Sequence, residues 1–235
     1  MLVTGFPAGA FAANCYIVAP AAGEECVIID PGQDAERGIE ELLARFRLKP
    51  VAVLLTHGHI DHVWSVGPVC GAKGIPAWIH PGDRGLLADP ASGLALNVGQ
   101  ELFGGITFTE PDDVRELADG LTLELVGVEL TVGHVPGHTQ GSVTFGTDGA
   151  PDPLGRDAPG GGTLFTGDLL FAGSIGRTDL PGGDHQAMLR SLTRTLARQS
   201  DDTLVLPGHG PQTTIGAERR TNPFLTGLEP AQRGL

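Results

Sequence analysis

Three histidines and an aspartate fall within one run of the sequence, HGHIDH at 57–62, shortly after the apolar run VAVLL. In an extended segment, residues two apart point the same way, so His57 and His59 can present their imidazoles to one ion. Asp61 and His62 follow where the chain turns into a helix, and there they can serve a neighbouring ion. Neutral imidazole and carboxylate suit zinc, iron or manganese, and two-metal sites hold their ions about 3.5–4 Å apart. The spacing therefore predicts a metal site.

Three further polar residues share one setting, because each follows an expected strand and lies beside glycine. They are His138 in HVPGHTQGS, Asp168 in LFTGDLLF and His209 in LPGHG. Glycine lets the backbone turn tightly and approach a ligand, and the loops at one end of an α/β sheet converge on one site. All the candidate ligands thus come from strand-end loops. Asp168, alone on its loop, is the candidate to bridge two ions.

Each of these residues also has a structural interpretation. A single histidine such as His138 is more often hydrogen-bonded within a fold than bound to a metal, and Asp168 by itself could cap a helix. The run HGHIDH reverses this balance, because without a ligand it would bury several polar groups that lack partners, each costing about 1–3 kcal/mol. The remaining histidines lack this context and are predicted to be structural or exposed: His80, His134 and His185.

Alternating strands and helices must position these loops. Strands are predicted at 13–20, 25–30, 51–55, 76–80, 142–146, 163–168 and the start of 203–210, with a hairpin over 121–134. The spacing of apolar residues predicts a helix over 34–48 with Asp34 as its N-cap. Further helices are predicted over 62–73 and after Asp184, the latter turning inward Met188, Leu189, Leu192 and Leu196. Residues 82–112 are predicted to form a lid-like insertion of short helices, and 147–162 a hairpin loop without chemistry.

Composition narrows the partners and the compartment. The net charge is −13, from 28 acidic against 15 basic residues, and an acidic surface repels phosphate backbones and anionic membranes. We therefore expect neither nucleic acid nor a membrane as a partner. Three cysteines without CxxC spacing favour a reducing compartment, and the first residues fit neither a signal peptide nor a membrane-spanning helix. The expected location is cytoplasmic, and the oligomeric state is left open.

The motifs THxHxDH, PGHTxGS, a strand ending in TGD, and PGHG together resemble those of the metallo-β-lactamase superfamily. The resemblance implies an α/β fold, the four-layer αββα sandwich, as a single domain over residues 1–235. It also implies a ligand set. His57, His59 and His138 would hold the first metal, and Asp168 would bridge to the second, which is held by Asp61, His62 and His209.

Within that superfamily, the run GDLLFAGSIGRTD resembles the glyoxalase II-type hydroxyacylglutathione hydrolases, in which a basic residue at the position of Arg177 contacts glutathione. Those enzymes typically carry THHHxDH, and here the middle position is Gly58. The ending TTIGAERRTNPFL resembles the short branch of this group. The resemblance implies hydrolysis of a small-molecule hydroxyacyl thioester, such as S-lactoylglutathione, by a hydroxide that bridges two divalent transition metal ions. Zinc is the expected metal, with iron or manganese as alternatives, and Asp61 would orient the hydroxide as well as bind metal.

Several alternatives stay open. Persulfide dioxygenases share this fold and a GRTD-like run, and they use a mononuclear iron that His57, His138 and Asp168 would hold here. A non-catalytic metal-binding domain and an RNA-processing nuclease of this fold are further alternatives. Asp30 either orients a metal ligand or serves as a turn residue, and Arg177 either binds a substrate carboxylate or pairs with a nearby aspartate.

Overall fold

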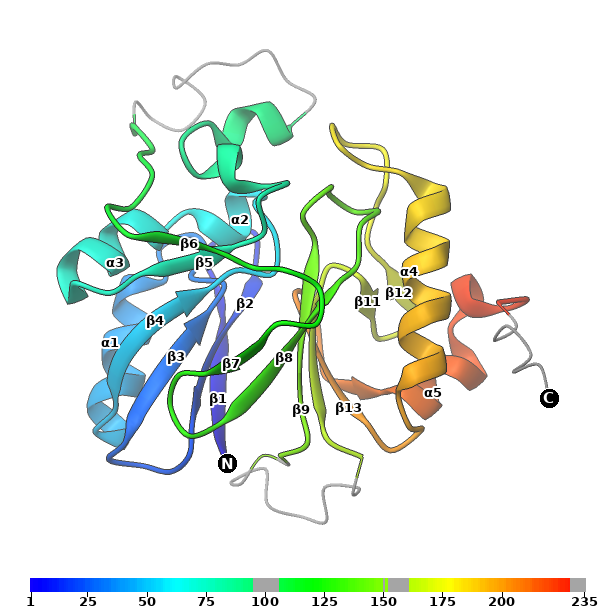
Figure 1. The fold of residues 1–235 in the computed structure, drawn as a ribbon, viewed down its shortest axis with the longest axis horizontal. Coiled ribbons are helices and arrows are strands. Elements are labelled where there is room, and N and C mark those ends of the chain that lie inside the picture. Colours follow the sequence, from blue (N-terminus) through cyan, green and yellow to red (C-terminus); the bar gives the residue numbers. More distant parts are fainter. Residues whose placement is uncertain (95–105, 150, 152–160, 229–235) are drawn as a thin grey trace.

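The computed structural model describes residues 1–94, 106–149, 151 and 161–228, and two six-stranded sheets form its centre (Figure 1). The strands of the first sheet follow one another in chain order. They are β1 (Leu2–Ala8), β2 (Ala13–Ala19), β3 (Glu25–Ile29), β4 (Lys49–Leu54), β5 (Ala77–Ile79) and β6 (Val114–Glu116). The first three are antiparallel, whereas β3 to β6 are parallel. Parallel neighbours end at the same edge, so the residues that follow β3 and β4 meet there.

The second sheet has the order β14-β13-β10-β9-β8-β7. Its strands are β7 (Thr122–Glu124), β8 (Glu129–His134), β9 (Val143–Thr147), β10 (Thr163–Gly167), β13 (Leu204–Pro207) and β14 (Thr213–Thr214). The neighbours β13 and β10 are parallel and the other neighbours are antiparallel. A two-stranded ribbon of β11 (Leu170–Phe171) and β12 (Ser174–Ile175) follows β10. The predicted hairpin over 121–134 is present as β7 and β8.

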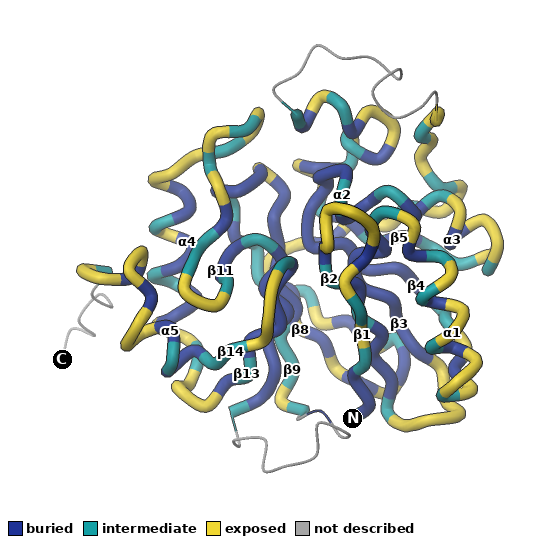
Figure 2. Tube along the Cα trace, turned by 180° about the vertical axis from the view of Figure 1, so that it is seen from behind, coloured by how far each residue is buried: buried dark blue, intermediate teal, exposed yellow. Residues whose placement is uncertain are grey.

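Helices cover the outer face of each sheet (Figure 1). α1 (Glu36–Phe46) and α3 (Val66–Lys73) lie on the first sheet, and α4 (His185–Arg198) and α5 (Ile215–Thr221) on the second. Apolar clusters fill the spaces between the four layers, and Phe145 and Phe165 are the largest buried side chains between the two sheets. The strands are mostly buried, while the connections and outer helix faces are exposed (Figure 2). The predicted αββα sandwich is therefore confirmed.

The apolar runs in the first sheet reflect burial on both faces. In β2, Ile17 packs toward the helices and Val18 packs between the sheets; in β4, Val53 and Leu54 divide in the same way. Successive residues of a strand point to opposite faces, so a strand that is covered on both sides is apolar at every position.

The helix predicted over 62–73 is interrupted. α2 (Ile60–Val63) ends before α3 begins at Val66. The Ser65 amide donates to the Pro31 carbonyl at 3.0 Å, and Gly32 lies so close that a Cβ there would be 2.2 Å from the Asp61 carbonyl oxygen. The turn that follows β3 thus occupies the space beside α2. Its Pro31 carbonyl accepts the hydrogen bond that the Ser65 amide would donate within a continuous helix.

The predicted N-cap of α1 is also wrong. Asp34 has a φ of +53°, and the helix begins at Glu36 after Ala35, whose side chain makes no capping bond. The hydroxyl of Ser65, 30 residues away in the sequence, takes over this role. It accepts from the Ala35 amide at 3.2 Å and donates to the Glu36 carboxylate at 3.0 Å.

The prediction for α4 holds apart from one side chain. Asp184 caps the helix by accepting a hydrogen bond from the Ala187 amide at 2.9 Å. Met188, Leu192 and Leu196 are buried, whereas Leu189 is only half-buried.

Other elements were not anticipated, among them β1, β6, β11, β12, β14 and α5. Of the predicted lid segment, 95–105 lies outside the described residues, and the described part includes two short 3-10 helices, η1 (Arg84–Leu87) and η2 (Pro90–Gly93). Positions 150 and 152–160 of the predicted hairpin loop also lie outside them. The three cysteines are free and buried. None of the helices in the described part of the chain is long and apolar enough to cross a bilayer.

Candidate metal centre

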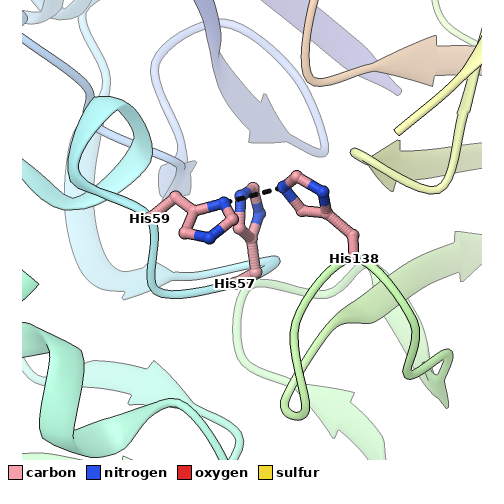
Figure 3. Close-up of side chains that lie close together, drawn as sticks. All are labelled: His57, His59 and His138. Atoms are coloured by element: carbon pink, nitrogen blue, oxygen red, sulfur yellow. Dashed lines mark hydrogen bonds between the residues drawn. The ribbon is translucent and has the colours of Figure 1, made fainter. Parts of the chain in front are cut away.

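The seven predicted ligands meet at one edge of the sandwich, each delivered by an element end. His57 and His59 follow β4, and Asp61 and His62 lie in α2. The turn between β8 and β9 carries His138, and Asp168 and His209 follow the parallel strands β10 and β13. Figure 3 shows the imidazoles of His57, His59 and His138 converging from opposite sheets. The two sheets therefore contribute to a single centre.

The ligand atoms form compact trios. Ring nitrogens of His57, His59 and His138 lie within 4.8 Å of one another, and so do ligand atoms of Asp61, His62 and His209. His209 is the most exposed side chain of the second trio. Its Nε2 is 3.1 Å from Asp61 Oδ2 and 3.3 Å from His62 Nε2. Each trio has the size of a site for one metal ion.

Asp168 lies between the two trios. Its Oδ2 is 3.4 Å from Nε2 of His138, a member of the first trio. Its Oδ1 is 3.4 Å from Nε2 of His62, a member of the second. One carboxylate thus faces both trios, and its Oδ2 is also 3.8 Å from His209 Nε2 of the second, which is the arrangement a bridging ligand requires.

Hydrogen bonds to oxygen orient the rings of His57 and His62. The Thr56 hydroxyl donates to Asp30 Oδ2 at 2.6 Å, so it accepts from His57 Nδ1 at 3.1 Å. The same Asp30 oxygen accepts from His62 Nδ1 at 2.9 Å. Asp30 is buried and also accepts from the Thr56 amide at 2.8 Å. These contacts favour the ligand-orienting interpretation of Asp30, because they turn Nε2 of both rings toward the centre.

The backbone orients His138 from the other sheet. Its Nδ1 donates to the Arg177 carbonyl at 2.7 Å, so its Nε2 carries the lone pair that faces the centre. Nδ1 of His59 lies 2.7 Å from that Nε2. A cation between these two rings would take the place of the proton they share.

Several buried polar atoms of the centre lack a partner. His57 Nε2, His59 Nε2 and Asp168 Oδ1 make no hydrogen bond within the described structure. A buried polar atom that stays unsatisfied costs about 1–3 kcal/mol, and these three atoms belong to two ligand loops, because His57 and His59 share the loop after β4. Metal coordination would satisfy His57 Nε2 and Asp168 Oδ1, while His59 faces His138 with its Nδ1, so the residues present fit a metal centre.

The protonation states of the ligand side chains also fit a metal centre. Burial lowers the pKa of His57 and of His59, the latter to about 3, so both rings are neutral ligands near pH 7. Burial disfavours ionisation of Asp61 and Asp168, but His62 and the other neighbouring histidines together outweigh it and hold the pKa of both carboxyls below its usual range. Burial likewise opposes a charge on His62, and these two carboxylates nevertheless raise its pKa. The buried carboxylates therefore require positive charge, which bound cations would supply.

Two glycines in the motifs are required for close approach. A Cβ on Gly208 would lie 2.2 Å from Asp168 Oδ1 and 2.9 Å from His62 Cε1. Gly167 has a φ of +48°, and a Cβ there would lie 2.6 Å from the Thr56 side chain. The glycines of PGHG and TGD thus let β10 and β13 reach the centre.

The departure at Gly58 has a structural cause. A Cβ on Gly58 would lie 2.7 Å from Leu86 Cδ1 and 3.0 Å from the Asp83 carbonyl oxygen. The segment around η1 therefore packs directly against the ligand loop, and it leaves no room for the histidine that is typical at this position.

Arg177 does not lie in the cluster. Its side chain is 60% exposed and pairs with Asp179 through two hydrogen bonds, of 2.7 and 2.8 Å. Only its carbonyl reaches the centre. His80 and His134 stack on each other with ring centroids 4.1 Å apart, and His185 is exposed.

Thr56 and Asp83 are among the polar residues that contact the ligand loops and were missed in the sequence. Thr56 relays the hydrogen bond between His57 and Asp30. Asp83 follows Gly82 shortly after β5, which is the same setting of a polar residue beside glycine after a strand that singled out Asp168 and His209.

Residues 8–209 match the Metallo-beta-lactamase superfamily. With the sandwich and the His/Asp cluster at its edge, the chain belongs to this superfamily. The match covers every predicted ligand.

Known relatives extend the match beyond the motifs. An uncharacterized protein of Mycobacterium tuberculosis is 50% identical over 97% of this chain and 99% of its own length. The hydroxyacylglutathione hydrolase GloC of Haemophilus influenzae is 34% identical, covering 93% of this chain and 95% of its own. Among solved structures, the B3 metallo-beta-lactamase BLEG-1 has a TM-score of 0.79 at 38% identity, with 96% of this chain and 100% of that chain covered. TTHA1623 in a di-iron-bound form has a TM-score of 0.71 at 41% identity, with 92% and 97% covered.

Proposed function

We propose that this protein is a metal-dependent hydrolase that cleaves a hydroxyacyl thioester, with S-lactoylglutathione as the reference substrate. The observation that carries the proposal is the pair of ligand trios that share Asp168. A mononuclear enzyme needs one trio, and here the residues of a second, Asp61, His62 and His209, are also in place. The similarity to a hydroxyacylglutathione hydrolase supports a thioester as substrate. Zinc is the expected metal, and iron is the alternative because of the di-iron form of a similar structure.

Two ions held in this way supply electrophilic activation of a carbonyl and a water-derived nucleophile at neutral pH. The chain contributes orientation and access. Asp61 stays a carboxylate because its pKa is held low, so it can accept a hydrogen bond from the attacking water. The side chains of Asp61 and His209 are 20% and 29% exposed, whereas His57, His59 and His138 are buried. The thioester carbonyl therefore approaches from the Asp61–His209 side.

Arg177 is the candidate to bind a carboxylate of the thiol carrier. Its guanidinium already makes a two-bond contact with a carboxylate, that of Asp179, and both side chains are exposed. A substrate carboxylate would replace Asp179 in the same geometry, since a guanidinium matches a carboxylate with two parallel hydrogen bonds.

A β-lactam is a second candidate substrate. The B3 metallo-beta-lactamase BLEG-1 is 38% identical over nearly the whole chain, and water attack on a strained amide requires the same carbonyl activation. We rank it second because the GDLLFAGSIGRTD run resembles thioester hydrolases.

The test is thiol release by metal-loaded protein. Protein reconstituted with zinc, assayed without oxygen, should release one thiol for each molecule of S-lactoylglutathione consumed, and Asp61→Ala and His62→Ala should each reduce the rate strongly. His185→Ala, at an exposed histidine outside the centre, is the matched control. If the iron form instead takes up oxygen with a persulfide, the zinc form is inert, and both variants keep activity, the protein is a dioxygenase. Hydrolysis of a β-lactam alone would favour the second candidate.

Metal content tests the centre itself. Elemental analysis should find about two transition-metal ions per chain, as expected for a two-metal site. Asp168→Ala should lose most of both, because this carboxylate faces both trios. Full occupancy in that variant would remove Asp168 from the bridging role.

A further inference from the structure

The carboxylate of Asp83 lies buried, 2% exposed, between the two loops that carry the first trio. Its Oδ2 accepts from the Gly58 amide at 2.9 Å and from the Thr139 hydroxyl at 2.6 Å, and its Oδ1 accepts from the Gly141 amide at 2.7 Å. Three donors thus converge on one side chain that binds no metal in the arrangement described above.

These donors belong to the two loops that carry the first trio. Gly58 stands between His57 and His59 on the first sheet, and Thr139 follows His138 on the second. The distance between His138 and the other two rings depends on how the sheets sit against each other. Asp83 joins the loops next to the ligands, so it fixes that distance locally.

The surrounding backbone is shaped for this contact. A Cβ on Gly141 would lie 2.7 Å from the Asp83 amide nitrogen, and a Cβ on Gly82 would lie 3.1 Å from the Gly141 nitrogen. Ser142 completes the turn, since its hydroxyl lies 2.7 Å from the Thr139 hydroxyl and accepts from the Thr139 amide at 3.1 Å. Thr139, Gly141 and Ser142 of the HTQGS run are therefore explained by the docking of Asp83.

A carboxylate is a costly choice if only packing were needed. Asp83 forms no ion pair with a lysine or arginine among residues the structure describes, so its desolvation is offset by the three hydrogen bonds alone. An asparagine of the same shape offers one acceptor oxygen, and its amide group would face a donor that it cannot accept from. The site thus requires both Oδ1 and Oδ2 of Asp83 to be hydrogen-bond acceptors.

We propose that Asp83 is a positioning residue for the first metal site: its carboxylate sets the spacing between the 57–59 loop and the 138–141 turn, and with it the metal affinity of His57, His59 and His138. This inference rests on the proposed metal centre, but it does not depend on which substrate is cleaved. The second trio takes none of its ligands from the 138–141 turn, so its affinity should not depend on Asp83.

The test isolates each trio before Asp83 is changed. His209→Ala disables the second trio, and His138→Ala disables the first. The affinity of the remaining site for Co²⁺ is then measured by competition with a chelator. The visible absorption of bound Co²⁺ is the signal. In the His209→Ala background, Asp83→Asn should weaken binding about 10- to 100-fold, the range for partners that orient ligands. In the His138→Ala background it should change binding less than about 3-fold, well below that range. Asp89→Asn, at an exposed aspartate of the same connection, is the control.

Two results would overturn the proposal: unchanged affinity in the His209→Ala background, or an equal loss in both backgrounds, which would assign Asp83 to the stability of the whole fold. If Asp83→Asn does not fold, Thr139→Val carries the test, because it removes one donor to the carboxylate and keeps the side-chain shape. It should weaken the first site in the same direction and leave the second unchanged. Thioester hydrolysis is not the readout, so failure of the proposed substrate would leave this result intact.

Discussion

Asp30 Oδ2 lies 2.9 Å from Nδ1 of His62, a contact that fixes this ring and leaves its Nε2 directed at the second trio. Asp30 has a φ of +50° and follows β3, so the strand end presents its carboxylate to α2 rather than to solvent. Because the ring direction depends on this carboxylate, the second trio depends on a residue that binds no metal itself.

Replacement of Asp30 by asparagine should therefore weaken the ion held by His62. Asparagine tolerates the positive φ, so the change removes the charge and one acceptor without straining the backbone. We expect a loss of about 10- to 100-fold in metal affinity, measured by chelator competition. Asp34→Asn is a matched control, since Asp34 has a φ of +53° and is exposed. Equal affinities in the two variants would show that the Asp30 contact is incidental.

A methyl group at position 208 should empty the centre. The Cβ of Gly208→Ala would lie 2.2 Å from Asp168 Oδ1, so the carboxylate or the strand end must move. Elemental analysis of the purified variant should find most of the metal lost. Gly71→Ala is the control, because a Cβ there meets nothing within 4 Å and alanine favours the helix. Retention of metal by Gly208→Ala would contradict the close approach of β13 to Asp168.

Arg177→Ala should separate substrate binding from catalysis. If the guanidinium binds a carboxylate of the thiol carrier, KM should rise several-fold for an anionic thioester and little for a neutral one, because only a remote contact is lost. Asp179→Asn keeps the guanidinium and releases it from its ion pair, so KM for the anionic substrate should stay the same or fall. Steady-state kinetics on the two substrates decide. Equal effects of Arg177→Ala on both would leave the residue a structural role only.

Glu218 should contribute to stability without touching the centre. Its buried carboxylate accepts from the Gly173 amide, the Thr213 hydroxyl and the Asn222 side chain at 2.7–2.8 Å. Glu218→Gln replaces one acceptor oxygen with a donor, so it should lower the free energy of unfolding by about 1–3 kcal/mol, measured by urea denaturation. Glu124→Gln, at an exposed position, should leave stability unchanged. A stable Glu218→Gln protein would show that the α5 network tolerates a missing acceptor.

The spacing of residues along the chain was enough to predict the central strands and the candidate ligands, and the resemblance of the motifs implied the four layers. Apolar runs predicted the central strands because burial on both faces makes every position apolar, and the strand-end rule gathered His138, Asp168 and His209 with the 57–62 run. β1 and β6 were missed, because the apolar N-terminal residues carry no clear strand pattern and Val114–Glu116 is very short. Local pattern identifies elements that are long and regular, and it is weakest for short edge strands.

The contacts that orient the centre came only from the tertiary structure. Ser65 serves α1 and breaks the α2–α3 run because the 31–36 segment packs beside it, and no local pattern carries that information. Asp30 reaches His62, and Asp83 reaches Thr139, across sequence separations of 32 and 56 residues. Such contacts depend on how the sheets and their edge loops pack against one another. The sequence by itself therefore determined which side chains gather at the centre, and the packing of the sheets decided what holds each of them in place.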